Sequence, residues 1–333
     1  MATAVRPLAA ARSRRVVVLV VVSALVAAGA VVGATLWQTR GESTTVPGSV
    51  IKAQSGTPPV FFDFGVRGGR EVQDLSRAAN LLNTKHVAAA RAIFARYHSV
   101  QARIGLAFAD WSDGDGLTTL KTLAAENPDS PAAQYHLGWA LYWSGHAADA
   151  AAAWKRVDTR FPDSPESVEA ENQLYASDQL GLPTLFLPVK LPQAASRAAQ
   201  QHLLATAARG PNVEAKLRYG YFLWELWHRV SAERQFAAAA RLAPHNPYAR
   251  TAAAVALFTK RAPRDAFSRL GPLTAVFPRA PVVRFELGLL LIATAQPAKG
   301  LKQLRLAAAE APRSSYAQAV RTLLSRIGKH GTE

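Results

Sequence analysis

Cysteine is absent from this chain of 333 residues, and methionine occurs once. Without thiols the chain cannot form disulfides, thiolate zinc sites, iron–sulfur clusters or a cysteine nucleophile, and it cannot carry a lipid on an N-terminal cysteine. A chain without thiols is compatible with either side of a membrane. The absence of cysteine therefore excludes thiol-dependent sites, and it does not show on which side of a membrane the protein works.

Catalytic motifs are missing as well. The sequence has no glycine-rich phosphate loop ending in lysine, no Gly-x-Ser-x-Gly elbow and no His-Glu-x-x-His. The eight histidines show no metal-ligand spacing, and we expect His136 and His228 on the surface or in a groove. The stretch ADWSDGDG lacks an EF-hand's last acid, because Ala124 stands there, so it predicts a turn between helices. We predict that the protein is not an enzyme and uses no cofactor and no metal ion.

Acidic residues are scarce in the second half of the chain. Residues 41–196 contain 13 Lys+Arg and 16 Asp+Glu, whereas residues 197–333 contain 21 and 7. The formal net charge of the whole chain is +16. Such a basic half attracts anionic surfaces, which include lipid headgroups, acidic wall polymers and nucleic acid. A solvated arginine-rich surface gives the same count, so charge alone does not assign a partner.

One uncharged run, residues 16–37, is long enough to cross a bilayer. Its 22 residues span about 33 Å as a helix, and Trp37 fits an interfacial aromatic. Four arginines precede the run, at Arg6, Arg12, Arg14 and Arg15. We therefore expect a single-pass anchor in the cell membrane, with residues 1–15 in the cytoplasm and residues 41–333 outside. The alternative is a signal peptide cleaved near Ala30, which would release the exported part.

The segment that follows, residues 38–69, is rich in Gly, Ser, Thr and Pro, and this composition predicts a juxtamembrane linker. Its stretch Pro58–Phe64 is too apolar for a simple spacer. We expect this stretch to pack on the first helix after it, as an N-terminal cap.

In the rest of the chain, apart from one interruption, prolines and small residues recur with a period of 34 residues. Prolines stand 34 residues apart at Pro128 and Pro162, and again at Pro244, Pro278 and Pro312. Each interval has a small residue in the middle of a predicted first helix and a larger one late in a predicted second helix. The small residues are Gly138, Gly220, Ala254 and Gly288, and the larger ones are Trp154, Phe236, Leu270 and Leu304. A small residue lets two helices approach closely, and a proline ends the pair, so the period predicts stacked helical hairpins.

These residues resemble the tetratricopeptide repeat (TPR) family. The stretch from Leu137-Gly138 through Ala150 and Trp154 to Pro162 is similar to the family's signature, and Leu287-Gly288 to Pro312 is a second match. The resemblance covers residues 70–328 and implies an all-α fold, a right-handed solenoid of helical hairpins, followed by a tail at 329–333. It implies little about activity, because one fold serves many functions.

One interruption falls at residues 180–192, LGLPTLFLPVKLP, between a helix at 165–178 capped by Ser164 and a helix at 193–208. Prolines at these intervals exclude a regular helix. Two interpretations are open: an apolar insertion that covers an exposed edge of the array, or a binding or gating element.

Aromatic and aliphatic side chains form stripes on the first helices, apart from the small-residue positions. In the TPR family this face lines a concave groove for ligands, so the resemblance implies a binding face. Its predicted residues are Tyr135, Trp139, Tyr142, Trp143, Leu217, Tyr221, Trp224, Phe258 and Phe285. The alternative is that a tight superhelix, or the chain's own proline-rich segments, covers these stripes. Family members that hold a C-terminal carboxylate use Lys and Asn on this face, which these aromatic and aliphatic positions do not supply.

We therefore expect a membrane-anchored scaffold or adaptor that binds protein or peptide segments on the extracytoplasmic side. The alternative function is a basic module that docks on an anionic envelope polymer or lipid. Nucleic acid is not expected as a partner. Salt separates the two functions, because apolar binding tolerates about 0.5 M salt whereas charge-driven docking is screened.

Overall fold

The computed structural model describes residues 53–111, 115–175 and 181–330, which form helices, turns and extended coil without a β-strand. The all-α class is therefore confirmed for these residues. The predicted membrane segment, residues 16–37, lies outside them, as does Leu180. In the described part of the chain, no helix combines the length and the apolar character that a bilayer crossing needs.

Short turns join most of the helices, and the longest interval between two of them separates α8 from α9. The helices are α2 (Arg70–Asn83), α3 (Val87–Phe94), α4 (Val100–Ala109), α5 (Gly116–Glu126), α6 (Pro131–Trp143), α7 (Ala147–Arg160), α8 (Pro165–Leu174), α9 (Arg197–Ala207), α10 (Val213–Glu225), α11 (Arg229–Leu242), α12 (Pro247–Val255), α13 (Pro263–Leu270), α14 (Leu273–Val276), α15 (Pro281–Ala293), α16 (Pro297–Glu310) and α17 (Ser315–His330).

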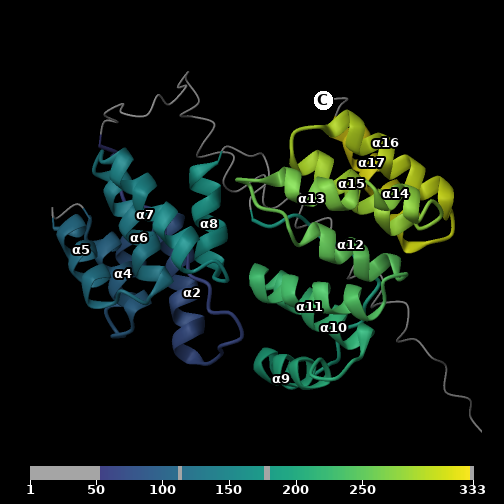
Figure 1. The fold of residues 1–333 in the computed structure, drawn as a ribbon. Helices are drawn as coiled ribbons and strands as arrows, with labels where there is room; N and C mark the ends of the chain where they lie inside the picture. The colour runs from purple at the N-terminus through teal and green to yellow at the C-terminus, as the bar shows by residue number, and fades with distance from the viewer. Residues whose placement is uncertain (1–52, 112–114, 176–180, 331–333) are drawn as a thin grey trace, which may run out of the picture.

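Most helices pack in pairs with their sequence neighbours, as a repeat array requires. The most extensive pairings are α15 with α16, α10 with α11, and α6 with α7. Figure 1 shows two groups, which we call the N-terminal array (α2–α8) and the C-terminal array (α9–α17). Two stretches of extended chain accompany the arrays, residues 58–64 and residues 182–192.

Local sequence explains where the helices begin. A Ser or Asn side chain accepts a hydrogen bond from the backbone N–H three residues on at the start of α4, α6, α8, α9, α10 and α12. In α6, α8 and α12 a proline follows this cap at the first helical position, where its missing N–H costs nothing. The predicted cap Ser164 is confirmed. Helix α9 begins at Arg197 and not at residue 193, because Ser196 supplies the cap.

A glycine of the first helix packs against a large side chain of the second helix in three repeats. The pairs are Gly138 with Trp154, Gly220 with Phe236, and Gly288 with Leu304. A Cβ atom at any of the three glycines would lie within 3 Å of its partner side chain, so only glycine allows this approach. The small-to-large packing predicted from the 34-residue period is confirmed, and it gives the described chain its TPR-like fold.

Replacing Gly138 by leucine is expected to overpack the contact between α6 and α7. A Cβ atom at Gly138 would already lie 2.3 Å from Nε1 of Trp154. We expect the variant to lose about 1–3 kcal/mol of unfolding free energy, measured by chemical denaturation. Gly210→Leu is the matched control, because no atom lies within 4 Å of a Cβ at Gly210. Equal stability of the two variants would contradict the packing.

Candidate functional site

Helix α6 presents the predicted aromatic residues of the N-terminal array. Tyr135 is buried, whereas Trp139, Tyr142 and Trp143 are half-buried. The Trp139 Nε1 donates to the Tyr135 hydroxyl at 2.9 Å. The rings of Trp139 and Tyr142 also lie 5.5 and 6.0 Å from the ring of Trp154 on α7. The stripes were expected to lie apart from the small-residue positions, and for Trp139 and Tyr142 this was wrong, because both contact the tryptophan that packs on Gly138.

The first extended segment, residues 58–64, lies across this face. Val60 is held at both backbone groups, because its N–H donates to Asn83 Oδ1 at 2.9 Å and its carbonyl accepts from Asn83 Nδ2 at 2.8 Å. The Phe61 ring packs edge-on against Tyr135 and stacks on Trp227, which follows α10 in the other array. The segment therefore reaches beyond the first helix, where it was expected to act as a cap, and it contacts both arrays.

His136, the residue after Tyr135 on α6, binds the first extended segment. The Phe61 N–H donates to His136 Nε2 at 3.1 Å, and Nδ1 lies 2.7 Å from the Ala132 carbonyl. Both contacts are satisfied by a neutral ring with its proton on Nδ1. The residue is completely buried, and this burial lowers the pKa of His136 to about 4. A surface position for His136 was expected as one of two options, and the structure excludes it.

We expect His136 to destabilise the fold as the pH falls from about 6.5 to about 4. The pKa of His136 is lowered in the folded chain, so the unfolded chain binds the proton first, and the stability is lost toward low pH. The full loss amounts to about 3 kcal/mol. A His136→Gln variant keeps an acceptor and a donor at this position without titrating. Denaturation at several pH values should show the wild type losing this stability relative to the variant, and parallel curves would contradict the prediction.

The C-terminal array carries the other five predicted residues. Leu217, Trp224, Phe258 and Phe285 are buried, and Tyr221 is half-buried. The second extended segment, residues 182–192, covers them. Its side chains Leu185, Phe186 and Leu187 are buried in one cluster with the four buried residues. The alternative that the chain's own proline-rich segments cover the stripes is therefore confirmed for this array, whereas an insertion over an exposed edge was expected for these residues.

Polar side chains hold the backbone of this second segment. The Trp224 Nε1 donates to the Pro183 carbonyl at 2.9 Å. At Phe186 the N–H donates to Glu286 Oε1 at 2.7 Å, and the carbonyl accepts from the Tyr316 hydroxyl at 3.2 Å. Burial raises the pKa of Glu286 well above its usual range, although the Phe186 N–H opposes this shift. The face therefore recognises an extended backbone by hydrogen bonds and its side chains by aromatic contact.

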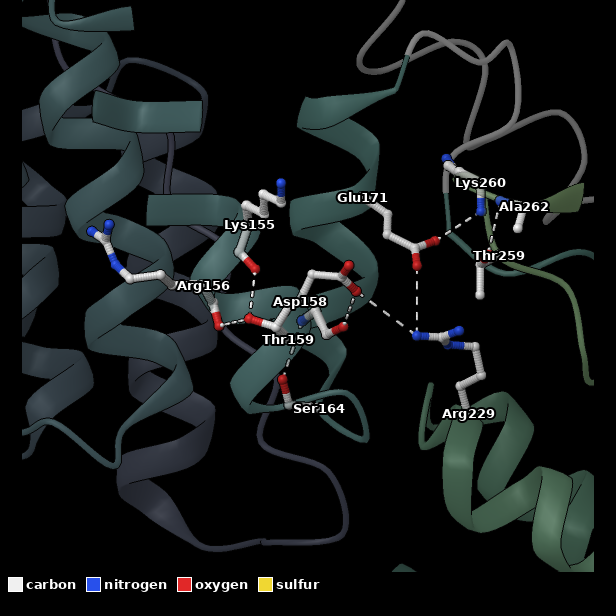
Figure 2. Close-up of polar contacts among 11 residues, drawn as sticks. Lys155, Arg156, Asp158, Thr159, Ser164, Glu171, Arg229, Thr259, Lys260 and Ala262 are labelled. Atoms are coloured by element: carbon white, nitrogen blue, oxygen red, sulfur yellow. Dashed lines mark hydrogen bonds and ion pairs between the residues drawn. The ribbon is translucent and has the colours of Figure 1, made fainter. Parts of the chain in front are cut away.

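The two arrays meet through a polar cluster around Arg229, shown in Figure 2. The Arg229 guanidinium at the start of α11 lies 3.9 Å from Asp158 of α7 and 3.5 Å from Glu171 of α8. The second carboxylate oxygen of Glu171 accepts a hydrogen bond from the backbone N–H of Lys260 at 3.0 Å. We call Asp158, Glu171, Arg229 and Lys260 the junction cluster.

Burial is the largest influence on the ionisation of Glu171 and Lys260. It raises the pKa of Glu171 although Arg229 lowers it, and it lowers the pKa of Lys260 to about 8 although nearby carboxylates raise it. Beside the cluster, Asp163 accepts from the Ser231 N–H at 2.8 Å, and its carbonyl oxygen lies 2.7 Å from His228 Nδ1. The arrangement fits a fixed connection between arrays, since each charged group has a protein partner.

Neither the junction cluster nor the side chains that bind the backbones of the two extended segments could be recognised in the sequence. The residues involved are dispersed, and Phe186 and Glu286 are 100 positions apart. A local signal existed only in α8, the last helix of the N-terminal array, which contains three glutamates; Glu166 and Glu171 are buried.

No family model and no curated protein matches this chain. Solved structures with some similarity include the TPR2AB domain of yeast Sti1 in complex with pHSP90, with 14% identity and a TM-score of 0.29, which covers 76% of this chain and 96% of that chain. A TPR protein of Thermus thermophilus has 17% identity and a TM-score of 0.24, with coverage of 75% and 99%. The RpL4 assembly chaperone Acl4 has 16% identity and a TM-score of 0.25, with coverage of 80% and 100%. Similarity at this level says nothing about what this chain binds, and its TPR-like fold rests on its own repeat packing.

Proposed function

We propose that this protein is a scaffold, and not an enzyme, that binds an extended segment of another protein at the half-buried aromatic residues of α6. The observation that supports this function is that both faces already hold extended chain. Each face combines buried polar groups for the backbone with aromatic rings for the side chains. This is the chemistry by which one protein holds an extended segment of another.

The half-buried aromatic residues of α6 are the most accessible part of these faces for a partner. Trp139, Tyr142 and Trp143 are only partly buried. The Trp143 Nε1 donates to the Gly56 carbonyl at 2.9 Å, so this ring already binds a backbone group just before the first extended segment. The partner that we propose is an apolar or proline-rich segment, because Tyr and Trp rings bury such side chains at low entropic cost.

A photo-crosslinking amino acid at Tyr142 in the full chain, irradiated in native membranes, tests this function. We expect a covalent adduct with another polypeptide that Trp139→Ala and Trp143→Ala each weaken, with a loss of at least about 1–2 kcal/mol in binding. The same amino acid at Thr159, an exposed position of α7, is the control. Equal adducts at both positions, or none at Tyr142, would refute the proposal.

The membrane anchor is part of the proposal. Residues 16–37 hold the scaffold at the cell membrane, with residues 1–15 in the cytoplasm and residues 41–333 outside. A reporter enzyme fused after Glu333 that is active only outside the cytoplasm is the expected result. Activity confined to the cytoplasm would reverse the orientation, and a chain recovered free of membranes would favour cleavage near Ala30.

A further inference from the structure

The second helices of the C-terminal array expose a surface that their packing does not require. Positions 34 residues apart take equivalent places in a repeat array, so three sets of five side chains can be compared one by one. We call these fifteen positions the outer face. They are Arg234, Ala238, Arg241, Leu242 and His245; Ser268, Pro272, Ala275, Val276 and Arg279; and Lys302, Leu306, Ala309, Glu310 and Arg313. All are exposed except the half-buried Ala238 and Glu310.

The outer face is basic. Five of its positions carry a cationic side chain, namely Arg234, Arg241, Arg279, Lys302 and Arg313. Its one carboxylate, on Glu310, is half-buried and forms an ion pair with Arg284. No exposed acid within the fifteen positions offsets the cations, so the surface attracts an anionic partner.

The outer face also exposes large aliphatic side chains. Val276 is 55% exposed, Leu242 is 44% exposed and Leu306 is 38% exposed. Leu242 and Val276 occupy the same place in consecutive repeats. Among the described residues, three of the four large hydrophobic side chains that are clearly exposed lie on this face. Apolar groups set among cations on one surface mark an interaction site.

The equivalent positions of the N-terminal array lack both features. They are Thr118, Thr122, Ala125, Glu126 and Asp129 of α5 and its following turn, and Ala152, Arg156, Thr159, Arg160 and Asp163 of α7 and its following turn. These positions have no large aliphatic residue, and three acids accompany the two arginines. Arg160 forms an ion pair with Asp129 at 2.6 Å. The outer face is therefore a property of the C-terminal array and not of an arginine-rich composition in general.

We propose that the outer face docks on an anionic lipid membrane. Cations near such a membrane each strengthen binding by about fivefold, and the aliphatic side chains enter the boundary between headgroups and acyl chains. An acidic wall polymer pairs with the cations equally well, but it offers no apolar phase for Leu242, Val276 and Leu306. This docking is independent of the aromatic faces, because it uses the second helices and not the first.

The absence of cysteine allows a direct test with one labelled position in the full chain. Val276→Cys carries an environment-sensitive fluorophore, and Thr159→Cys on the N-terminal array carries the same fluorophore as the control. The full chain is reconstituted with phosphatidylcholine vesicles that contain or lack phosphatidylglycerol. Since residues 16–37 are present in every sample, their insertion does not differ between the two labelled positions. We expect a blue shift and quenching by brominated lipid at Val276 only with phosphatidylglycerol, and no change at Thr159.

Charge-reversal variants test whether the cations of the outer face cause the binding to anionic vesicles. The double variant Arg241→Glu, Lys302→Glu should lower the equilibrium constant between the docked and the undocked face, measured with the Val276 label, by at least about 25-fold. A salt concentration of about 0.5 M should have a similar effect. Arg156→Glu with Arg160→Glu, on the N-terminal array, should change nothing. A label at Val276 that stays in water on anionic vesicles overturns the proposal. Dextran sulfate, an anionic polymer, is the second probe. If the protein binds it through Arg241 and Lys302 while the Val276 label stays in water on vesicles, the lipid proposal is also overturned, because the face then binds a polymer.

Discussion

In a Phe186→Ala variant, the backbone amides of residues 182–192 are expected to exchange hydrogen about a hundredfold faster than in the wild type. Phe186 is buried, with its ring 5.4 Å from Phe285 and 5.2 Å from Tyr316. Removing a buried phenylalanine ring costs about 3–5 kcal/mol, which is more than a hundredfold in the equilibrium between the bound and the released segment. Hydrogen exchange followed by mass spectrometry measures this change.

The loss is expected to stay local, because the helices of the C-terminal array retain their own small-to-large contacts, such as Gly220 with Phe236. Residues 58–64 on the other array should exchange as in the wild type. Leu203→Ala is the matched control, since Leu203 is 50% exposed and its truncation should change stability by less than about 0.5 kcal/mol. Unchanged exchange at 182–192 would show that the segment does not depend on its aromatic contacts.

The helical part of this fold could be predicted because its determinants repeat along the chain. The prolines and small residues recur every 34 positions, and the structure places Gly138 against Trp154 as that spacing predicts. The N-terminal caps are equally local, since Ser130 and Ser164 each precede a proline that opens a helix. Such signals need only helix geometry to be interpreted.

The coverage of the candidate site could not be predicted from the same signals. Extended segments gain their stability from partners far along the chain, and neither segment has a period of its own. Phe61 donates to His136, 75 positions away, and Phe186 donates to Glu286, 100 positions away. The sequence therefore predicted an aromatic face and left open whether the chain covers it. The structure shows that five of the nine predicted residues are buried, and that the exposure that remains is greatest on α6.

Arg229→Met is expected to weaken the connection between the two arrays by about 3–5 kcal/mol at neutral pH. The Arg229 side chain is 12% exposed, and it lies near two carboxylates that are almost fully buried, Asp158 and Glu171. Removing one partner of a buried ion pair leaves the other charge in a medium that solvates it poorly. Chemical denaturation should report the loss, and small-angle X-ray scattering should report a larger radius of gyration if the arrays separate. Arg160→Met is the control, because Arg160 and Asp129 form an exposed pair that contributes at most about 1 kcal/mol.

A second variant distinguishes the unpaired charge from the lost side-chain packing. Glu171→Gln removes the charge but keeps an oxygen that can accept from the Lys260 N–H. Added to Arg229→Met, it should restore part of the lost stability, because one of the two buried negative charges is then gone. Lower pH should act in the same direction, since burial raises the pKa of Glu171 and its protonated form needs no cation. If neither Glu171→Gln nor acid reduces the deficit of Arg229→Met, the connection depends on the packing of the arginine side chain and not on its charge.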